Sequence, residues 1–568
     1  MVYAYLHELA YPMQKGRGQL LTSTSPGSTN TPSKKSTLRQ AILPYCKNYC
    51  DVSSLHGIHY VTDIKRPRFE RIIWMLLLIA TTCSCIYVYS DMADLYHSQR
   101  IETIVQDSMT PIFIRPFPSI GICPRNRINW PKLLKADQLF LPPNATAVAV
   151  RTFRQFFAIL STSQFGDFFY LKPLTELELD LSLLDNVDIA EVMRHVSLTC
   201  DEFFEQPCYW QQIGYNCCEL FSLERTENGF CFVFNSLVTE MDRERQRKDR
   251  YYPYHNSKDS VRSGLYVVVN LDGSKRHPNY TGPIGVNLMV KLTDQWHSTA
   301  RFIRQSTDST VTVNAQLTVT DERTRSSTPK ERKCLFEDED EHPLYKTLPG
   351  LKYRRSNCFT RCRQEYTFNY CKCNMDLFFP HDPNDNVTAC KAKDFKCFYE
   401  YRDLFNADHH VLESKYLDNV SNGSMICECL SSCDQMIFVT NYISSPWEGN
   451  NTTSVVKQAR LDVHYASAYM MTYCTRLRYT FVELLANFGG IMGFFMGASL
   501  ISCVELVYYF TVRLYTHLRE GGYIPDGCLY SRESTDKKTY LRRKNRPRQG
   551  KRFLKSLKPA PITPYFRH

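Results

Sequence analysis

The sequence predicts an α+β membrane protein in which two transmembrane helices flank a large, disulfide-rich extracellular domain of mixed α and β structure. Three observations support this fold class. Two uncharged apolar runs lie towards the ends of the chain, cysteines crowd the interval between them, and β-branched residues recur in that interval. A chain of 568 residues with 43% hydrophobic residues can also form packed cores in several domains.

The two apolar runs predict the membrane spans. Residues 72–90 and 484–504 contain no charged side chain, and each run is close to the ~20 residues that a helix needs to cross a bilayer. A buried helix of a soluble protein is the alternative, but such helices rarely lack charges over this length. The N-terminal residues are polar and rich in Ser and Thr, so we expect no secretory signal peptide.

The distribution of charge predicts the orientation in the membrane. Residues 1–71 carry a net charge of +6 and residues 513–568 a net charge of +11, so with a total of +11 the chain between them carries −6. Basic residues beside a span mark its cytoplasmic face, so we expect both termini in the cytosol. The basic residues nearest the spans are Lys65, Arg66, Arg68, Arg71, Arg513 and Arg519.

These signals divide the chain into five parts. We expect a cytosolic N-terminal region at 1–71, a first transmembrane helix at 72–90, an extracellular domain at 91–479, a second transmembrane helix at 480–512 and a basic cytosolic tail at 513–568. The basic cluster at 542–552 is expected to meet anionic membrane lipid or to stay solvated, rather than to bind nucleic acid. The glycosylation sequons all fall in the expected extracellular domain, at Asn144, Asn279, Asn386, Asn419, Asn422, Asn450 and Asn451.

Cysteine usage indicates an oxidising compartment. Of the 23 cysteines, seventeen lie between the spans and ten of these lie in residues 334–433, a density typical of disulfide-stapled structure. Zinc binding is the alternative at Cys371-x-Cys373 and Cys427-x-Cys429, but two-residue spacers and neighbouring histidines are missing. Because seventeen is odd, at least one thiol is free or bonded to another chain, and Cys474 is the leading candidate.

The rest of the expected extracellular domain shows both strand and helix patterns. Residues 265–271, 284–292 and 310–320 are rich in β-branched residues that partly alternate, which predicts strands. Residues 174–184 and 187–196 have a more helical pattern. We therefore expect a sheet core accompanied by helices.

Short motifs beside the spans carry a resemblance to a known family. Residues 54–57 read Ser-Leu-His-Gly, and residues 117–123 read FPSIGIC. In the second span, LLANFGG at 484–490 is followed by MGFF at 492–495 and by Gly-Ala-Ser at 497–499. These stretches resemble the cytosolic His-Gly motif, the F-P-A-x-T-x-C element and the pore helix of the degenerin/epithelial sodium channel family, which includes acid-sensing channels and insect pickpocket proteins.

The resemblance implies an acid-sensing-channel-like fold and a disulfide pattern that spacing alone could not assign. The long tails and the Cys217-Cys218 doublet before residues 229–232 are most similar to the pickpocket branch. Family likeness assigns no partner to Cys200, Cys208, Cys217 or Cys218. The implied pairs are Cys334–Cys433, Cys358–Cys429, Cys362–Cys427, Cys371–Cys397 and Cys373–Cys390, which form a nested, thumb-like ladder in 334–433, and Cys123–Cys231.

The resemblance also implies the selectivity filter. In the family a G/S-x-S tripeptide interrupts the second transmembrane helix and helps to set sodium selectivity, and Gly497, Ala498 and Ser499 occupy the matching positions. Glycine permits the departure from helical backbone. Backbone carbonyls that leave the helical ladder and a serine hydroxyl are hard oxygen donors that can replace part of the water shell of a sodium ion.

Further residues of the second span are expected to line the pore. In a continuous helix Gly489, Gly493 and Gly497 would form one stripe of small residues, with Gly490 beside it, where neighbouring helices approach closely. Glu505 lies about two turns beyond the filter and would place a ring of carboxylates at the inner mouth. The alternative for Glu505 is an interfacial side chain that reaches the cytosol.

Four residues are expected to act in gating. By resemblance, His56 and Gly57 lie in a re-entrant cytosolic segment beneath the filter, whereas the sequence alone also permits an ordinary juxtamembrane turn. Ala486 matches a position at which family members need a small side chain to close, because added bulk wedges packed helices apart. Asn487 stands where several acid-sensing members have aspartate, so acid activation is not assumed.

Together these features predict a subunit of a trimeric, sodium-selective and amiloride-sensitive cation channel, which is sensory and opened by an extracellular or mechanical stimulus. It would assemble as a homotrimer or with related subunits, need no cofactor beyond the permeant sodium ion, and contact membrane lipid and an extracellular ligand of unknown kind. The alternatives are a two-span, non-conducting cell-surface receptor and a trimeric channel of the ATP-gated type.

Enzyme classes are disfavoured by the motifs that the sequence lacks. It contains no G-x-S-x-G, H-E-x-x-H, Walker-type loop or dinucleotide fingerprint. The histidine doublet at His409 and His410 has only loosely placed acidic neighbours, so we expect a solvated loop there and no metal site.

Overall fold

The structure is a computed structural model that describes residues 45–98, 100–177, 179–381, 387–410, 423–447 and 457–519. The chain divides into two compact units. We call Met1–Met92 with Phe481–His568 the helical unit, and Ala93–Thr480 the sheet domain. The basic cluster at 542–552 lies outside the described residues, as do the sequons Asn386, Asn419, Asn422, Asn450 and Asn451.

The helical unit contains both apolar runs. The first forms part of one continuous helix, α3 (Arg68–Ser98), and its stretch Arg68–Tyr96 is long and apolar enough to cross a membrane. The second run is not one helix, because α16 (Phe481–Met496) and α17 (Leu500–Tyr508) meet at a bend of 73°. Such a bent pair is either one broken span or a re-entrant loop. The unit also contains α2 (Ile58–Thr62), the π-helical turn η7 (Tyr509–Arg513) and α18 (Leu514–Arg519).

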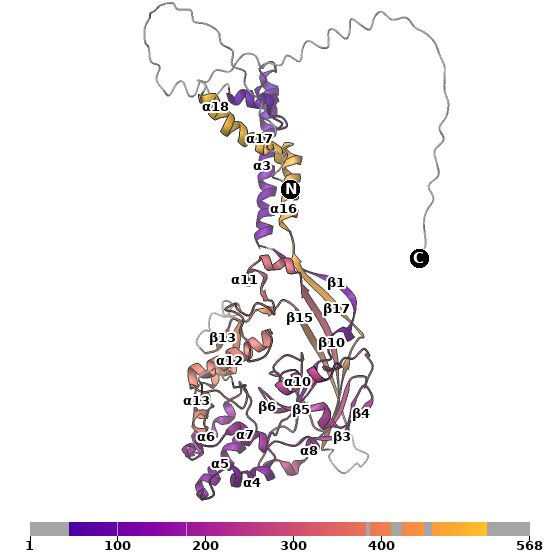
Figure 1. The fold of residues 1–568 in the computed structure, drawn as a ribbon, viewed down its shortest axis with the longest axis vertical. Coiled ribbons are helices and arrows are strands. Elements are labelled where there is room, and N and C mark those ends of the chain that lie inside the picture. The colour runs from indigo at the N-terminus through magenta and orange to yellow at the C-terminus, as the bar shows by residue number, and fades with distance from the viewer. Residues whose placement is uncertain are drawn as a thin grey trace, which may run out of the picture. The chain divides into compact units, whose positions relative to one another are not determined.

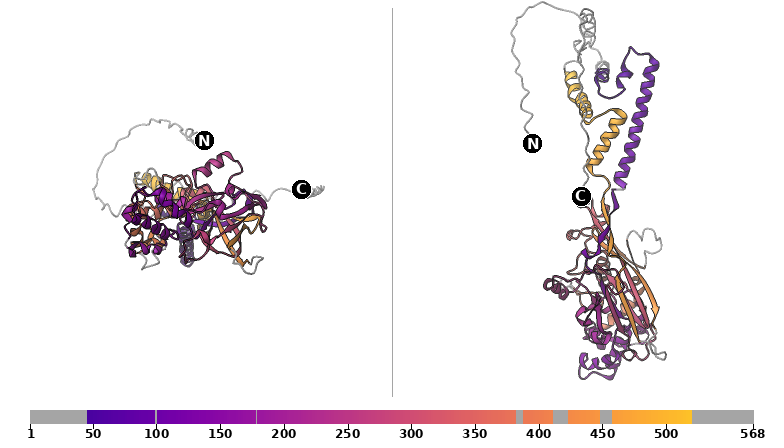
Figure 2. Two further views of the ribbon diagram at one scale, coloured as in Figure 1. Left: turned by 90° about the horizontal axis from the view of Figure 1, so that it is seen from below. Right: turned by 90° about the vertical axis from the view of Figure 1, so that its right-hand side faces the viewer.

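Helices α3 and α16 lie side by side (Figures 1 and 2). Cys85 Sγ of α3 is 3.5 Å from Met492 Sδ of α16. One turn further along α3, the ring of Tyr89 meets the ring of Phe488 edge-on, with 5.3 Å between the ring centroids. Sulfur and aromatic contacts therefore join the two helices along their shared length.

The larger sheet of the sheet domain has eight strands. Strand β10 pairs with β15 in antiparallel orientation along almost its whole length. On its other side, β10 pairs in parallel orientation with β16 and then with β17. The strand order is β1 (Ile101–Pro111), β17 (Tyr469–Leu477), β10 (Thr307–Thr320), β16 (Gln458–Tyr465), β7 (Leu265–Asn270), β3 (Phe204–Trp210) and β4 (Ile213–Tyr215), with β15 (Gln435–Pro446) attached to β10.

The smaller sheet has five antiparallel strands, in the order β5 (Phe221–Thr226), β6 (Gly229–Phe234), β2 (Ser119–Pro124), β8 (Gly285–Lys291) and β9 (Arg301–Arg304). Every residue of the central strand β2 is buried. At Gly121, where the related family usually has threonine, a Cβ atom would lie 2.7 Å from Met289 Cε and 3.1 Å from His297 Cδ2. A larger side chain would therefore displace a buried neighbour, which explains this departure.

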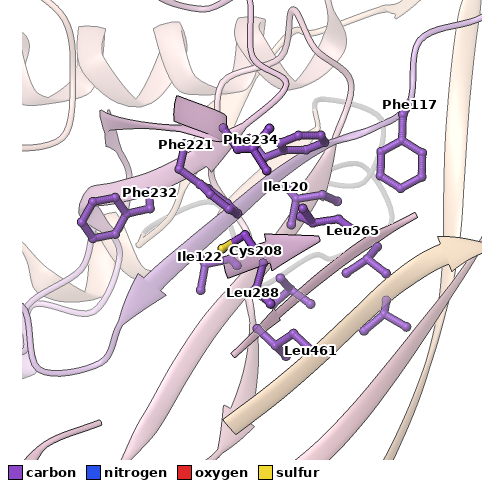
Figure 3. Close-up of a cluster of buried hydrophobic side chains, with 14 of the residues drawn as sticks. Phe117, Ile120, Ile122, Cys208, Phe221, Phe232, Phe234, Leu265, Leu288 and Leu461 are labelled. Atoms are coloured by element: carbon purple, nitrogen blue, oxygen red, sulfur yellow. The ribbon is translucent and has the colours of Figure 1, made fainter. Parts of the chain in front are cut away.

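The main hydrophobic core lies between the two sheets. Figure 3 shows side chains of β2, β5, β6 and β8 gathered close to Leu265 of β7 and Leu461 of β16. Phe117, Ile120 and Ile122 from the FPSIGIC motif are each fully buried in this cluster. This core joins the two sheets of the domain.

A second core is helical and gathers at one end of the sheet domain (Figures 1 and 2). Its helices include α4 (Trp130–Phe140), α5 (Ala147–Leu160), α7 (Ile189–His195) and α13 (Phe395–Glu400). The side chains of Asn129, Thr146 and Asp188 cap the first three by accepting a bond from a backbone N–H in the first turn. Residues 174–184 form only the short helix α6 (Pro173–Glu176) and the turn η3 (Leu181–Leu184), not one continuous helix.

Short elements complete the sheet domain. They are η1 (Ile112–Ile114), η2 (Phe169–Leu171), α8 (Cys200–Phe203), α9 (Cys217–Leu220), α10 (Glu240–Lys248), η4 (Gly273–Lys275), η5 (Glu322–Ser326), α11 (Pro329–Arg332), β11 (Cys334–Leu335), α12 (Arg355–Cys371), η6 (Ala392–Asp394), α14 (Arg402–Asn406), β12 (Asp408–His410), β13 (Met425–Cys427) and β14 (Ser431–Ser432).

Eight disulfides connect the sheet domain. Six join the pairs that the family resemblance implies: Cys123–Cys231, Cys334–Cys433, Cys358–Cys429, Cys362–Cys427, Cys371–Cys397 and Cys373–Cys390. The other two are Cys200–Cys218 and Cys208–Cys217, so each member of the cysteine doublet bonds to a different segment. Cys474 forms no disulfide in the structure.

Candidate pore site

The break between α16 and α17 falls at Gly497, Ala498 and Ser499. Gly497 adopts φ +63°, a left-handed conformation that favours glycine. Ser499 then begins α17 as its N-cap, with Ser499 Oγ accepting a hydrogen bond of 3.2 Å from the backbone N–H of Ser502. Among the described residues, no N–H bonds to the carbonyl oxygens of Gly497 and Ala498. The break therefore leaves two unpaired backbone oxygens next to a serine hydroxyl.

The His-Gly turn lies directly against this break. The backbone N–H of His56 donates a hydrogen bond of 3.1 Å to the carbonyl oxygen of Met496, the last residue of α16. The imidazole of His56 fills the space beside Gly497, where a Cβ atom would lie only 1.3 Å from His56 Nδ1. The structure thus brings together two motifs from opposite ends of the chain.

Ser54 adds a second connection between the same two segments. Its Oγ donates a hydrogen bond of 3.0 Å to Ser502 Oγ and lies 3.4 Å from Glu505 Oε2. Sequence reasoning identified Glu505 but missed Ser54 and Ser502. The Ser499-x-x-Ser502 spacing was an available signal, because a serine N-cap with a polar residue three positions later is typical of a helix start.

Helix α3 supports the turn from the other side. Gly57 adopts φ +86°, and a Cβ atom there would lie 3.3 Å from Leu78 Cδ2 of α3. The ring of Tyr60 in α2 stacks on Trp74 of α3, with 4.6 Å between the ring centroids. The His-Gly turn is consequently packed between the first apolar helix and the broken second one.

A third contact that the sequence did not predict lies further along the second helix. The hydroxyl of Tyr45 donates a hydrogen bond of 2.6 Å to the carbonyl oxygen of Tyr509, the first residue of the π-helical turn η7. The rings of Tyr45, Tyr49 and Tyr509 form a small buried cluster. The same carbonyl oxygen also accepts a bond from the backbone N–H of Leu514, so Tyr45 adds a second donor and ties the N-terminal segment to the π-helical turn.

The small residues of α16 face open space within one copy of the chain. No described atom lies within 4 Å of a Cβ placed on Gly489 or Gly490, and the nearest to Gly493 is the carbonyl oxygen of Ala498 at 3.8 Å. Ala486 and Asn487 are also exposed. The stripe expected from a continuous helix is shorter than we predicted, because Gly497 lies outside α16.

The remaining candidate sites lie in the sheet domain. Asn144 and Asn279, the two sequons within the described residues, are both exposed. His409 and His410 belong to strand β12 and not to a loop. Within the described part of the chain, no group of three or more His, Cys, Asp or Glu side chains could hold a metal ion.

A continuous apolar helix, a second apolar helix broken at a glycine and a disulfide-rich domain of mixed α and β structure together indicate a membrane protein with a large folded domain. Residues 49–509 match the model of the amiloride-sensitive sodium channel family. Because this match covers most of the chain, the chain belongs to that family, whose members are ion channels and not enzymes. The family match confirms the resemblance seen in the sequence.

Two individual relatives are similar over most of their length, and a third over a shorter stretch. Pickpocket protein 19 of Drosophila melanogaster is 28% identical over 474 residues, which cover 83% of this chain and 91% of that protein. Sodium channel protein Nach of Drosophila ananassae is 24% identical over 496 residues, covering 85% and 89%. Degenerin mec-10 of Caenorhabditis elegans is 25% identical over a shorter stretch of 192 residues, covering 31% and 24%.

Proposed function

We propose that the chain is a subunit of a trimeric, sodium-selective cation channel of the plasma membrane, with two spans and both termini in the cytosol. The observation that carries this proposal is the broken second helix. Within the described chain no N–H bonds to the carbonyl oxygens of Gly497 and Ala498, and the hydroxyl of Ser499 follows them. His56 packs against this break through its backbone N–H and its imidazole. In a packed protein core such oxygens would be costly, whereas in a water-filled pore they can coordinate ions.

The proposed selectivity depends on oxygens without a formal charge. Three subunits would each contribute carbonyl oxygens and a serine hydroxyl to a narrow ring that replaces part of the water shell of a sodium ion. Glu505 lies beyond the break on α17 and would draw cations to the inner mouth. The alternative is that Glu505 is an interfacial side chain that reaches the cytosol. Its contact with Ser54 would then have no role in conduction.

Assembly is supported by the surface that a single copy leaves uncovered. Subunits of this family assemble as oligomers with related subunits. On α16, Phe481, Val482 and Phe494 are 70%, 73% and 84% exposed, and Gly489 faces open space. Large apolar side chains suit contact with lipid, and glycines suit the close approach of neighbouring helices. We propose that amiloride blocks the pore, and that the channel is sensory and opened by an extracellular or mechanical stimulus.

The decisive test uses Ala486→Val in oocytes. The added bulk at an exposed position of α16 should wedge neighbouring helices apart and hold the pore open. We expect a constitutive, amiloride-sensitive current at least tenfold above that of the wild type, and its loss when a large organic cation replaces sodium. Two-electrode recording with surface biotinylation measures both the current and the amount of protein.

Ala486→Gly is the matched control, because it changes the same residue without adding bulk and should stay closed. If Ala486→Val reaches the surface and carries no current, alone or with related subunits, the chain is a non-conducting receptor. A current that needs extracellular ATP would instead support the ATP-gated class.

A further inference from the structure

A cavity of about 540 Å³ lies within the sheet domain, between segments that are far in sequence from the pore motifs. Its wall comes from the end of β2, the loop after α5, the β5–β6 turn, the loop before β9, helix α12 and the end of α14. This volume is within the range of about 300–1,000 Å³ that is typical of small-molecule sites. The cavity is therefore large enough for a small organic ligand.

The acidic groups of the cavity already have cationic partners. Arg363 donates to Glu227 Oε2 at 2.5 Å and to Asp408 Oδ2 at 2.9 Å. Glu227 also accepts a bond of 2.8 Å from Thr360 Oγ1. The ammonium group of Lys291 lies behind the wall, 2.8 Å from Thr299 Oγ1. A cationic ligand would have to displace these partners.

Arg125 is different, because no described carboxylate lies within ion-pair distance of it. Its one hydrogen-bond partner among the described side chains is the neutral amide oxygen of Gln164, at 3.1 Å. Two residues further on, Arg127 is only 3% exposed, and none of its guanidinium nitrogens has a partner in the described chain. Arg127 packs beside the wall, since a Cβ on Gly229, next to the lining residue Asn228, would lie 3.3 Å from Arg127 Cδ.

Arg127 remains a cation at neutral pH. Burial and, to a smaller extent, the neighbouring Arg125 together lower the pKa of this guanidinium to about 9, while Tyr280 and Asp167 oppose the shift. In and around the cavity, four basic side chains outnumber three acidic ones. The basic residues are Arg125, Arg127, Lys291 and Arg363, and the acidic ones are Glu227, Asp408 and Asp167. The excess positive charge is at the Arg125 end, because the acids at the other end are already paired.

The walls of the cavity are partly aromatic. Phe165, Phe302 and Phe405 line it, and the rings of Phe165 and Phe405 meet edge-on with 6.1 Å between their centroids. Phe302 is 37% exposed, which leaves a large part of its side chain free for contact. Aromatic walls favour a ligand with an apolar body.

We propose that this cavity binds a small carboxylate with an apolar, ring-sized body. Its carboxylate would pair with Arg125, where a planar guanidinium can donate two parallel hydrogen bonds. Its apolar part would lie between Phe165, Phe302 and Phe405. The binding does not depend on the proposed pore, so it is tested without any measurement of current.

The probe is radiolabelled phenylacetate, measured by equilibrium dialysis against the purified full-length protein in detergent, with a detergent-only blank. Phenylacetamide and phenethylamine have the same ring with a neutral and a cationic head. We expect saturable binding of phenylacetate, and binding at least tenfold weaker for both analogues. Arg125→Gln should weaken binding about tenfold or more, because it removes a hydrogen bond between two charged groups.

Two further variants keep the result interpretable. Arg151→Gln makes the same change at an exposed arginine of α5 and should bind phenylacetate like the wild type. Ala300→Trp fills the cavity from its exposed wall and should abolish binding without changing any charge. The proposal is overturned if phenylacetate shows no saturable binding at millimolar concentration, if phenylacetamide binds equally well, or if Arg125→Gln binds as tightly as Arg151→Gln.

Discussion

At Gly497 two independent structural constraints both favour glycine. The backbone has φ +63°, which costs an L-residue about 1 kcal/mol or more, and the imidazole of His56 occupies the place of a side chain. The first demand concerns only the local turn, whereas the second depends on a segment from the other end of the chain. A substitution at Gly497 therefore disturbs both the break and the His-Gly turn.

We predict that Gly497→Ala reduces the sodium current of the Ala486→Val channel at least tenfold at equal surface expression. His56→Gly in the same background removes the overlap and leaves only the cost in φ, so it should restore part of the current. Oocyte recording of the four combinations forms a double-mutant cycle that measures the coupling. Gly273→Ala, at a position with open space around it, is the control. Independent, additive effects at His56 and Gly497 would contradict the contact.

Glu224 is a buried acid outside the candidate sites. It is 2% exposed, and burial together with the nearby charge of Asp242 raises the pKa of Glu224 well above its usual value. The hydroxyls of Ser222 and Ser236 donate to its two oxygens, at 2.7 and 2.9 Å, and oppose that shift only in part. Burial also raises the pKa of Asp242, and the bonds from Thr239 and the charge of Arg245 oppose that rise only in part. The folded domain thus favours the protonated form of Glu224.

The stability of the sheet domain should consequently fall as pH rises. Below the unfolded pKa of about 4.5 the carboxyl is protonated in both states. As pH rises from the unfolded pKa through the folded pKa, the unfolded chain ionises first while Glu224 keeps its proton inside the protein. Stability is therefore lost, by about 1.4 kcal/mol for each unit by which folding raises the pKa. Glu224→Gln should therefore match the wild type at pH 4.5 and exceed it at pH 8 in thermal unfolding. A variant that is less stable than the wild type at pH 8 would show that the charged form is favoured.

Among the elements, the disulfide ladder is a set of nested rungs. Cys358 and Cys362 lie one turn apart on α12 and bond to Cys429 and Cys427. These bonds close loops with sequence separations of 71 and 65 residues. When one rung is removed, its neighbour still holds the two segments together, so only the short ring between the rungs is opened.

We predict that removing these rungs is not additive. Each alone, as Cys358→Ser/Cys429→Ser or Cys362→Ser/Cys427→Ser, should cost about 2 kcal/mol, because only a short ring opens. Removing both opens a long loop and should cost more than the sum of the two by about 1 kcal/mol or more. Urea unfolding of the purified protein, followed by tryptophan fluorescence, measures this because four of the five tryptophans lie in the sheet domain. Equal and additive losses would mean that each rung acts by itself.

Over the whole molecule, local patterns predicted local structure and little beyond it. The strand expected at 265–271 is β7, and the one at 310–320 forms most of β10. The three partners of β10 could not be predicted, because pairing depends on segments that are distant in sequence. The helical pattern at 174–184 predicted one element, but the structure has two short ones there. The length of a helix depends mainly on tertiary packing, which the hydrophobic period of a sequence does not reveal.

At the candidate pore too, the sequence predicted individual residues better than the contacts between them. The family resemblance supplied Gly497 and Glu505, and it placed His56 in a segment beneath the filter. No periodicity or motif indicated that His56 fills the space beside Gly497, or that Ser54 reaches Ser502. The Cys200–Cys218 and Cys208–Cys217 pairs were equally hidden, since two adjacent cysteines with two possible partners allow either pairing.

The contact between His56 and the carbonyl of Met496 also has a consequence for biosynthesis. A ribosome makes the His-Gly turn before the whole sheet domain with its eight disulfides, and it makes the filter after them. The turn must therefore wait, without its partner, until the rest of the chain has been translated. The contact can form only after the filter has been made, so a chain that stalls earlier cannot yet form the break or a pore that leaks ions.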